Sequence, residues 1–289
     1  MTDTTLVHQS NDTFSPESDW IHISSKGQGI REGLRELLNT GDLLRMLILR
    51  HLKIRFAQTA MGAFWVVLQP LMTALIFSVL FGVFVKVPSD GLPYVAFAYP
   101  GMALWTLFAQ GFDRGSTSLV LEERLITKVY FPRLVIPLSA TLSAVADFII
   151  STLLIFPLAL VFGVSLSWRL PLFLIAVPPI LFLAIAMGVL TASLSVRYRD
   201  LRQVAPFITQ LWFYATPVVF PLKVVPEGLK NAVLWNPAGA PILLFRSAFF
   251  GTPMPPMWSI MSSYLISVLL LTLAVTVFRK VERGMADWL

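Results

Sequence analysis

The feature that most constrains this chain is a series of long apolar runs that contain almost no charged residues. A helix that crosses the hydrocarbon core of a bilayer needs about 20 predominantly apolar residues, and six runs approach or exceed that length. Charged residues make up 13% of the chain, about half of the roughly 25% found in soluble domains. The sequence therefore predicts an all-α integral membrane protein with six transmembrane helices. Their expected positions are 63–85, 94–112, 134–162, 170–195, 205–222 and 258–278.

Composition divides the chain into three parts: a polar tail at 1–29, an amphipathic segment at 30–57 and a transmembrane domain at 58–289. In the amphipathic segment an apolar stripe runs beside Lys and Arg residues, and Asp42 is placed to cap a helix. This pattern is typical of a helix that lies in the headgroup layer of a membrane. We therefore expect N-terminal amphipathic interfacial helices; the alternative is a soluble amphipathic helix docked on a partner.

The distribution of Lys and Arg predicts the orientation of the chain. If the N-terminus lies inside, 17 of the 22 Lys and Arg residues fall on the inner side of the membrane. Cytoplasmic segments carry such an excess of basic residues, so both termini are expected in the cytoplasm. The same asymmetry accounts for the net charge of +6 without a nucleic-acid partner.

Residues 223–257 are expected outside the membrane, yet they contain apolar stretches. Asn236 is typical of a helix N-cap and Pro237 of a first helical position, while Gly251 suits the position just past a helix end. The helix between them would be about 21 Å long at 1.5 Å per residue, too short for a core of about 30 Å. A second short helix is expected to start at Pro226. We predict two outer re-entrant half-helices between spans five and six, the alternative being a lid on the membrane surface.

Several kinds of chemistry are disfavoured by what the sequence lacks. It contains no G-x-x-x-x-G-K-[ST] phosphate loop, so the chain is expected not to be an enzyme that hydrolyses nucleotide by itself. It has no cysteine, and its three histidines precede the first span, so no metal site and no cofactor are predicted. Asp147 lies inside the third span, where a carboxylate is costly. It is either a proton or ion site or a structural hydrogen-bond partner of a neighbouring helix, and we favour the structural interpretation.

The inner loop at 121–133 is rich in charge. It is either a solvated loop or a short helix parallel to the membrane that docks on a cytoplasmic partner. Its candidate docking residues are Glu122, Glu123, Arg124 and Lys128.

Aromatic and amide side chains recur in the first and fifth spans. Aromatic rings bind the faces of sugars, whereas amides are costly in lipid and are expected to face a cavity or another helix. Most individual aromatics in such a bundle simply pack it or form interfacial belts. The candidate lining residues of a channel are Trp65, Gln69, Phe81, Gln210 and Tyr214.

Four stretches and the Asn236-Pro237 pair carry a resemblance to a known family. The stretches are RFAQTAMGAFWVVLQPLMTALIFSVLFG, ITKVYFPRLVIPLS, VADFIIS and VRYRDLRQVAPFITQLWFYATPVVFP. Over residues 35–289 the chain resembles the permease subunits of ABC transporters that export lipid-linked polysaccharide of the O-antigen and teichoic-acid type.

The resemblance implies a homodimer in the cytoplasmic (inner) membrane that works with two copies of a separate ATPase, which binds the ATP and Mg. It implies that residues 122–130 form the coupling helix, that spans one and five line a glycan channel, and that Asn236 and Pro237 belong to its outer gate. The lipid-diphosphate end of the substrate would be attracted by basic residues before the first span, namely Arg50, Lys53 and Arg55. The alternatives are an ABC permease for a drug or small lipid, and an ion-coupled secondary transporter that uses Asp147.

Overall fold

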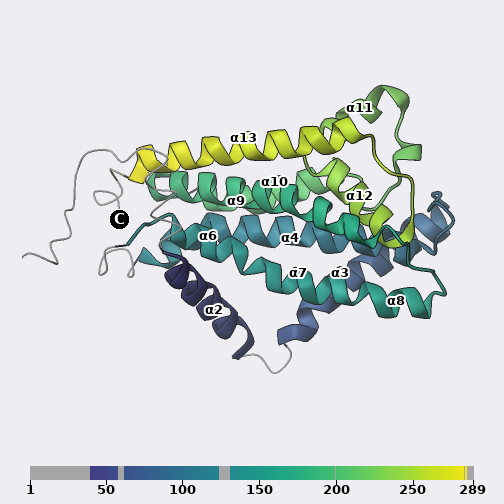
Figure 1. Ribbon diagram of the computed structural model, residues 1–289, viewed down its shortest axis with the longest axis horizontal. Helices are drawn as coiled ribbons and strands as arrows, with labels where there is room; N and C mark the ends of the chain where they lie inside the picture. The colour runs from purple at the N-terminus through teal and green to yellow at the C-terminus, as the bar shows by residue number, and fades with distance from the viewer. Residues whose placement is uncertain (1–39, 58–61, 124–130, 199, 283, 285–289) are drawn as a thin grey trace, which may run out of the picture.

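The computed structural model describes residues 40–57, 62–123, 131–198, 200–282 and 284, and every regular element in this part of the chain is helical (Figure 1). In chain order the elements are α2 (Gly41–Ala57), α3 (Gly62–Phe77), the π-helix η1 (Ser78–Phe84), α4 (Tyr94–Leu121), α6 (Val135–Leu142), α7 (Ala144–Leu153), α8 (Ile155–Val161), the 3₁₀ turn η2 (Leu170–Leu172), α9 (Phe173–Arg197), α10 (Leu201–Tyr214), the 3₁₀ turn η3 (Leu222–Val224), α11 (Glu227–Trp235), α12 (Gly239–Phe250) and α13 (Met257–Glu282).

Four helical stretches in the described chain are long and apolar enough to cross a membrane. They are Phe64–Phe84, Val135–Val161, Leu170–Arg197 and Met257–Glu282. They coincide with the first, third, fourth and sixth apolar runs, which confirms the prediction of an all-helical membrane protein. A shorter apolar helix, Gly239–Phe250, lies between the fifth and sixth runs.

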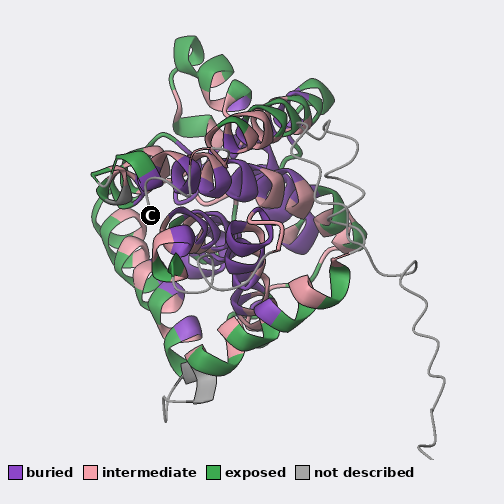
Figure 2. Ribbon diagram, turned by 90° about the vertical axis from the view of Figure 1, so that its left-hand side faces the viewer, coloured by how far each residue is buried: buried purple, intermediate pink, exposed green. Residues whose placement is uncertain are grey.

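The second run forms α4, which lies in the middle of the bundle between the other long helices (Figure 1). At 28 residues it continues past the expected end at residue 112; Arg114 in this extension pairs with Asp147, while Asp113 is exposed. Most of its residues are buried, and the buried positions of the whole bundle gather in its centre (Figure 2). Its own side chains in the core include Phe108 and Phe112, which are fully buried.

The fifth run forms a shorter helix than expected. Helix α10 has 14 residues and ends at Tyr214 rather than near residue 222. Pro217 disfavours helical geometry at the residue before it and cannot donate a backbone hydrogen bond itself. The chain therefore leaves the helix and turns toward α11.

Helices α11 and α12, the segment expected to form the outer half-helices, are located at the end of the bundle opposite α2 (Figure 1). Helix α11 begins directly after Pro226, and Gly251 ends α12 in the left-handed conformation with φ 66°, as expected. One expected cap was wrong, because Asp42 lies within the first turn of α2. Helix α12 begins at Gly239 instead of Pro237, and Asn236 ends α11 in extended backbone while its side chain accepts from the N–H of Ala238.

Helix α12 is held inside the bundle by a buried arginine. The side chain of Arg246 is 1% exposed. It donates from Nε to the carbonyl of Phe97 (2.8 Å) and from Nη2 to the carbonyl of Val218 (2.6 Å). The guanidinium therefore joins α12 to α4 and to the turn after α10, and these carbonyls satisfy its donors, as a buried charge requires.

Glycines allow α4 to approach α9 closely. A Cβ added at Gly115 would lie 3.0 Å from Cα of Gly188 and would overlap the hydroxyl of Thr141 on α6. Small residues at such positions let helix backbones pack closely where no hydrophobic effect drives them together.

Replacing Gly115 by leucine should therefore destabilise the bundle by about 1–3 kcal/mol, the usual cost of overpacking. Thermal unfolding of the detergent-solubilised protein, followed by loss of the monodisperse species, would show a lower midpoint. Gly228→Ala is the matched control because a Cβ there meets nothing within 4 Å. An unchanged midpoint for Gly115→Leu would contradict this account of the α4–α9 contact.

Candidate functional site

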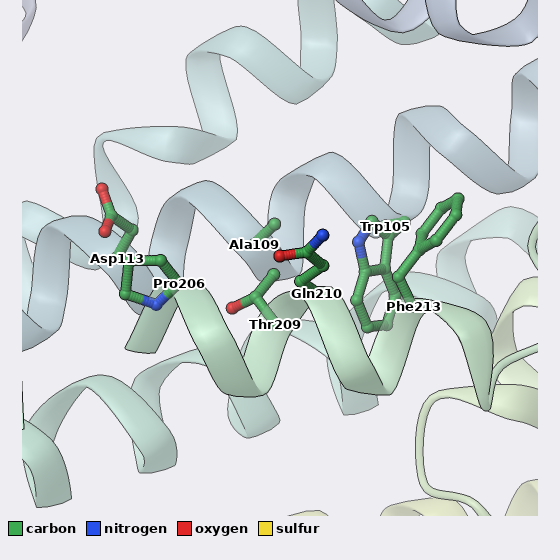
Figure 3. A pocket seen from close by; sticks show the side chains of 7 residues that line it. All are labelled: Trp105, Ala109, Asp113, Pro206, Thr209, Gln210 and Phe213. Carbon is green, nitrogen blue, oxygen red and sulfur yellow. The ribbon is translucent and has the colours of Figure 1, made fainter. Parts of the chain in front are cut away.

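A groove between α4 and α10 combines aromatic, amide and acidic side chains (Figure 3). We call it the α4–α10 groove; its volume is about 330 Å³. The α4 residues recur every fourth position and the α10 residues every third or fourth, so each helix presents one face to the groove. The lining residues are Trp105, Ala109, Asp113, Pro206, Thr209, Gln210 and Phe213.

The groove changes character along its length. At one end the rings of Trp105 and Phe213 meet edge to face, with centroids 5.8 Å apart. Gln210 and Thr209 lie in the middle, and Asp113 is at the opposite end, toward the C-terminus of α4 (Figure 3). Such an arrangement can pack the apolar face of a ligand on aromatic rings and hydrogen-bond its polar groups.

The predicted channel residues fall into two groups. Gln210 lines the groove, and Tyr214, one turn further along α10, is exposed and contacts Phe213 with ring centroids 5.4 Å apart. Trp65 and Gln69 lie on a second exposed face, that of α3, four residues apart. Neither helix buries these faces within the chain.

Phe81 is placed differently from the other predicted channel residues. It is half-buried in an aromatic stack with Phe77 (centroids 5.5 Å apart) and Tyr94 (6.4 Å). Phe77 in turn contacts Phe213 (5.8 Å). Phe81 therefore supports the contact of the first span with α4, while Phe77 carries the contact with α10.

Of the seven groove residues the predicted set contained only Gln210, and the residues that it missed include Trp105 and Asp113. Both belong to α4, which the sequence marked only as a span. With Ala109 they recur at intervals of four residues, and this spacing was the one signal that they share a face. Which helix faced them could not be read from the chain.

Asp147 is the centre of a buried ion-pair cluster. Its carboxylate is 1% exposed and pairs with Arg114 of α4 and with Arg55 of α2 (3.2 Å). Arg114 also donates to Oε1 of Gln110 (2.8 Å) and Oγ of Ser143 (3.0 Å). The sequence alone identified no basic partner for Asp147; the structure supplies two, from helices distant in the chain.

A second ion pair connects α2 to the end of α4. Arg50 pairs with Glu122, the residue that ends α4, at 3.0 Å. Between the two pairs, burial lowers the pKa of His51, against the opposing effect of nearby Glu122, so the imidazole is neutral at pH 7. Leu47 is buried on the same side. Helix α2 is thus fastened to the bundle along one face.

The expected lipid-diphosphate residues are therefore not equivalent. Arg50 and Arg55 are engaged in ion pairs inside the chain, whereas Lys53 is exposed and makes no ion pair with the described residues. Glu122 and Glu123 of the expected coupling segment are described, but Arg124 and Lys128 lie outside the described residues.

Asn236 links the end of α10 to the start of α12. Its Oδ1 accepts hydrogen bonds from Nε1 of Trp212 (2.9 Å) and from the backbone N–H of Ala238 (3.0 Å). Its Nδ2 donates to Oγ1 of Thr216 (2.9 Å). Pro237 follows in the short link between α11 and α12. The amide group therefore joins the groove helix α10 directly to the link between α11 and α12.

Residues that could hold a metal ion do not gather in the described part of the chain, where no group of three His, Cys, Asp or Glu side chains occurs.

Comparison with known proteins identifies relatives along nearly the whole chain. The O-antigen export system permease protein RfbA of Myxococcus xanthus is 27% identical over 88% of this chain and 98% of its own length. The protein of the same name from Klebsiella pneumoniae is 28% identical over 85% of this chain and 94% of its own length. The polysialic acid transport protein KpsM of Escherichia coli is 21% identical over 70% of this chain and 79% of its own length.

The family described as ABC-2 type transporter matches residues 42–250, which include every residue of the α4–α10 groove, the Asp147 cluster and the Asn236 link. The chain therefore belongs to the ABC-2 type transporter family.

Proposed function

We propose that this chain is the channel-forming permease subunit of an ATP-driven exporter that moves lipid-linked O-antigen-type polysaccharide across the cytoplasmic membrane. The observation that carries the proposal is the α4–α10 groove, whose aromatic and amide side chains suit a sugar chain, in a member of the ABC-2 type transporter family. The names of its relatives, two O-antigen permeases among them, point to the same substrate class.

The proposed topology has six spans and two outer re-entrant half-helices. To the four apolar spans we add α4, about 42 Å long at 1.5 Å per residue, and the shorter α10. Helices α11 and α12 do not reach across a core of about 30 Å, and α12 is buried against protein, where non-spanning backbone is tolerated. The excess of Lys and Arg on one side supports cytoplasmic termini.

The channel would lie between two copies of this chain. The exposed faces of α3 and α10 carry Gln69 and Gln210, and polar groups in lipid-facing positions are costly. A second copy placed against these faces would enclose them together with Trp65 and Tyr214. A homodimer thus gives the amides a polar or water-filled surrounding and gives a glycan a continuous path.

The driving force would come from a separate cytoplasmic ATPase, present in two copies, because the chain has no phosphate loop of its own. We propose that it binds the segment 122–130. Glu122 begins this segment and pairs with Arg50, so displacement there would move α2 as well as α4. Rigid-body movement of packed helices is a common way to transmit such a push.

The lipid-diphosphate end of the substrate would enter near the outward face of α2. This face is exposed and mixes basic with apolar side chains, as suits the headgroup layer. Lys53 is the residue of the expected three that is available for a phosphate, while Arg50 and Arg55 hold the helix in place. The residues of the outward face are Arg45, Met46, Leu49, Lys53 and Ile54.

An ion-coupled transporter is disfavoured by the setting of Asp147. A coupling carboxylate must be free to exchange its proton or ion during each cycle, whereas this one is buried and shared by two arginines. No observation on the described residues favours a small-molecule permease over a glycan exporter.

The proposal is tested in proteoliposomes that contain this chain and its partner ATPase, where the export of a lipid-linked glycan is measured. Glycan should reach the lumen only with ATP, and the purified chain alone should hydrolyse none. Gln210→Leu, which keeps the size of the side chain but removes its amide, should lower export roughly tenfold, as about 1.4 kcal/mol of lost interaction implies. ATP hydrolysis by the isolated chain, or ATP-independent export, would contradict the proposal.

Trp212→Phe should uncouple the groove from the outer half-helices. Phenylalanine keeps the aromatic contact with Phe108 (centroids 5.2 Å apart) but cannot donate to Asn236, a loss of about 1 kcal/mol. We expect more ATP hydrolysed per glycan exported, with little change in thermal stability. Trp235→Phe, at an exposed position on α11, is the control, and an equal ratio in both variants would refute the link.

Asp147→Asn should release α2 from the bundle. It removes the carboxylate shared by Arg55 and Arg114 at a cost of about 3 kcal/mol, the low end for a buried pair because Arg55 is partly exposed. The chain has no cysteine, so maleimide labelling of Leu47→Cys, 5% exposed in the native chain, reports detachment. Labelling should accelerate in the Asp147→Asn background, whereas Leu49→Cys, 47% exposed, should change little. Equal acceleration at both positions would indicate general unfolding instead.

A further inference from the structure

We propose that the passage through this permease is selective for glycans without acidic groups, because its described walls hold one carboxylate and no cation. The inference rests on the proposed function and specifies the substrate class within it. The charge that sets this selectivity is that of Asp113, which no step above has used.

The charges along the proposed path are few. Helix α3 and the π-helix η1 contain no charged residue, and neither does α10 from Gln203 to Tyr214. Among the seven residues that line the α4–α10 groove, Asp113 alone is charged. A glycan in contact with these described surfaces therefore meets one negative charge in each copy of the chain and no positive charge.

The basic residue next to Asp113 in the sequence does not change this balance. Arg114 follows Asp113 in sequence, but it is directed to another side of α4, where it pairs with Asp147 and donates to Gln110 and Ser143. Successive helical residues are about 100° apart around the axis, so the side chains of Asp113 and Arg114 contact different neighbours. Arg114 belongs to the cluster that holds α2, and Asp113 belongs to the groove.

A neutral sugar chain suits such walls. The rings of Trp105 and Phe213 can cover the apolar face of a pyranose, and Gln210 and Thr209 can exchange hydrogen bonds with its hydroxyls. Asp113 accepts hydrogen bonds from hydroxyl groups, and charge-assisted bonds of this kind are stronger than neutral ones. The hydroxyl groups of a neutral repeat can thus find partners in the groove, and they supply the hydrogen-bond donors that the carboxylate of Asp113 needs.

An acidic repeat fits poorly for two reasons. A carboxylate or phosphate on the glycan would lose part of its hydration in the groove and find no cation to replace it. It would also pass Asp113, and like charges in a partly dehydrated site repel each other more strongly than in water. Because a polymer repeats its charge, the penalty recurs at each repeat that passes.

The test compares two lipid-linked glycans on the same lipid carrier, one built of neutral hexoses and one that carries a uronic acid in each repeat. Export is measured in proteoliposomes with the chain and its ATPase, and the result is the ratio of neutral to acidic rates for each variant. A ratio cancels differences in folding and in reconstituted amount. We expect the native chain to favour the neutral glycan by at least about tenfold, the ratio that corresponds to about 1.4 kcal/mol.

Two variants should lower this ratio. Asp113→Asn removes the repulsion, and Gln210→Lys places a cation in the groove, so that acidic export should rise relative to neutral export. Asp200→Asn, an exposed carboxylate before α10 and outside the groove, is the control and should leave the ratio unchanged. If Asp113→Asn fails to fold, Gln210→Lys alone decides the matter.

The outcomes separate the two proposals. Equal export of both glycans by the native chain, or ratios that do not change in either groove variant, would overturn the charge selectivity and leave glycan export intact. Unchanged ratios would also result if a second copy of the chain filled the groove, and that result too counts against the inference. Export of neither glycan while the complex hydrolyses ATP would overturn the proposed function itself.

Discussion

The sharing of one buried carboxylate by two arginines is the interaction on which the packing of α2, α4 and α7 depends. Asp147 lies on α7, Arg114 on α4 and Arg55 on α2, so a single charge fixes the relative positions of three helices. A carboxylate at this depth is costly unless it is paired, and each arginine is equally restricted by its partner. The helices cannot separate without exposing an uncompensated charge to an apolar surrounding, which makes their arrangement specific as well as stable.

Helix α4 connects the Asp147 cluster to the rest of the molecule, because its different faces contact different parts of the structure. One face presents Arg114 and Gln110 to the ion-pair cluster. Another presents Trp105 and Asp113 to the groove, and Gly115 brings its backbone against α9. A rotation or shift of α4 would therefore alter the cluster and the groove together. The polar residues that make α4 less apolar than the four long spans are those that give it these two functions.

Local chemistry explains how much could be predicted from the sequence. Four of the apolar runs, the helix start after Pro226 and the end at Gly251 depend on neighbouring residues alone, and they were found correctly. The partners of Asp147 depend on which helices pack together, and Arg55 is 92 positions away along the chain. The same limit hid Trp105 and Asp113, whose groove exists only because α10 faces α4. Asn236 was recognised as a capping residue, but its side chain serves a junction between three elements rather than one helix.

At the end of the bundle near α12 a buried arginine again joins helices, but its acceptors are uncharged. Arg246 and Asn236 both connect the region around α10 to α12, the first through backbone carbonyls and the second through Trp212 and Thr216. Three arginines therefore have partners inside the chain. Arg114 and Arg55 pair with Asp147, and Arg246 donates to backbone carbonyls. What remains along the groove is an aromatic and amide surface with one carboxylate. The selectivity that we propose for the passage then depends on the same ion pairs that hold the helices together, because Arg114, the basic residue next to Asp113, is paired with Asp147.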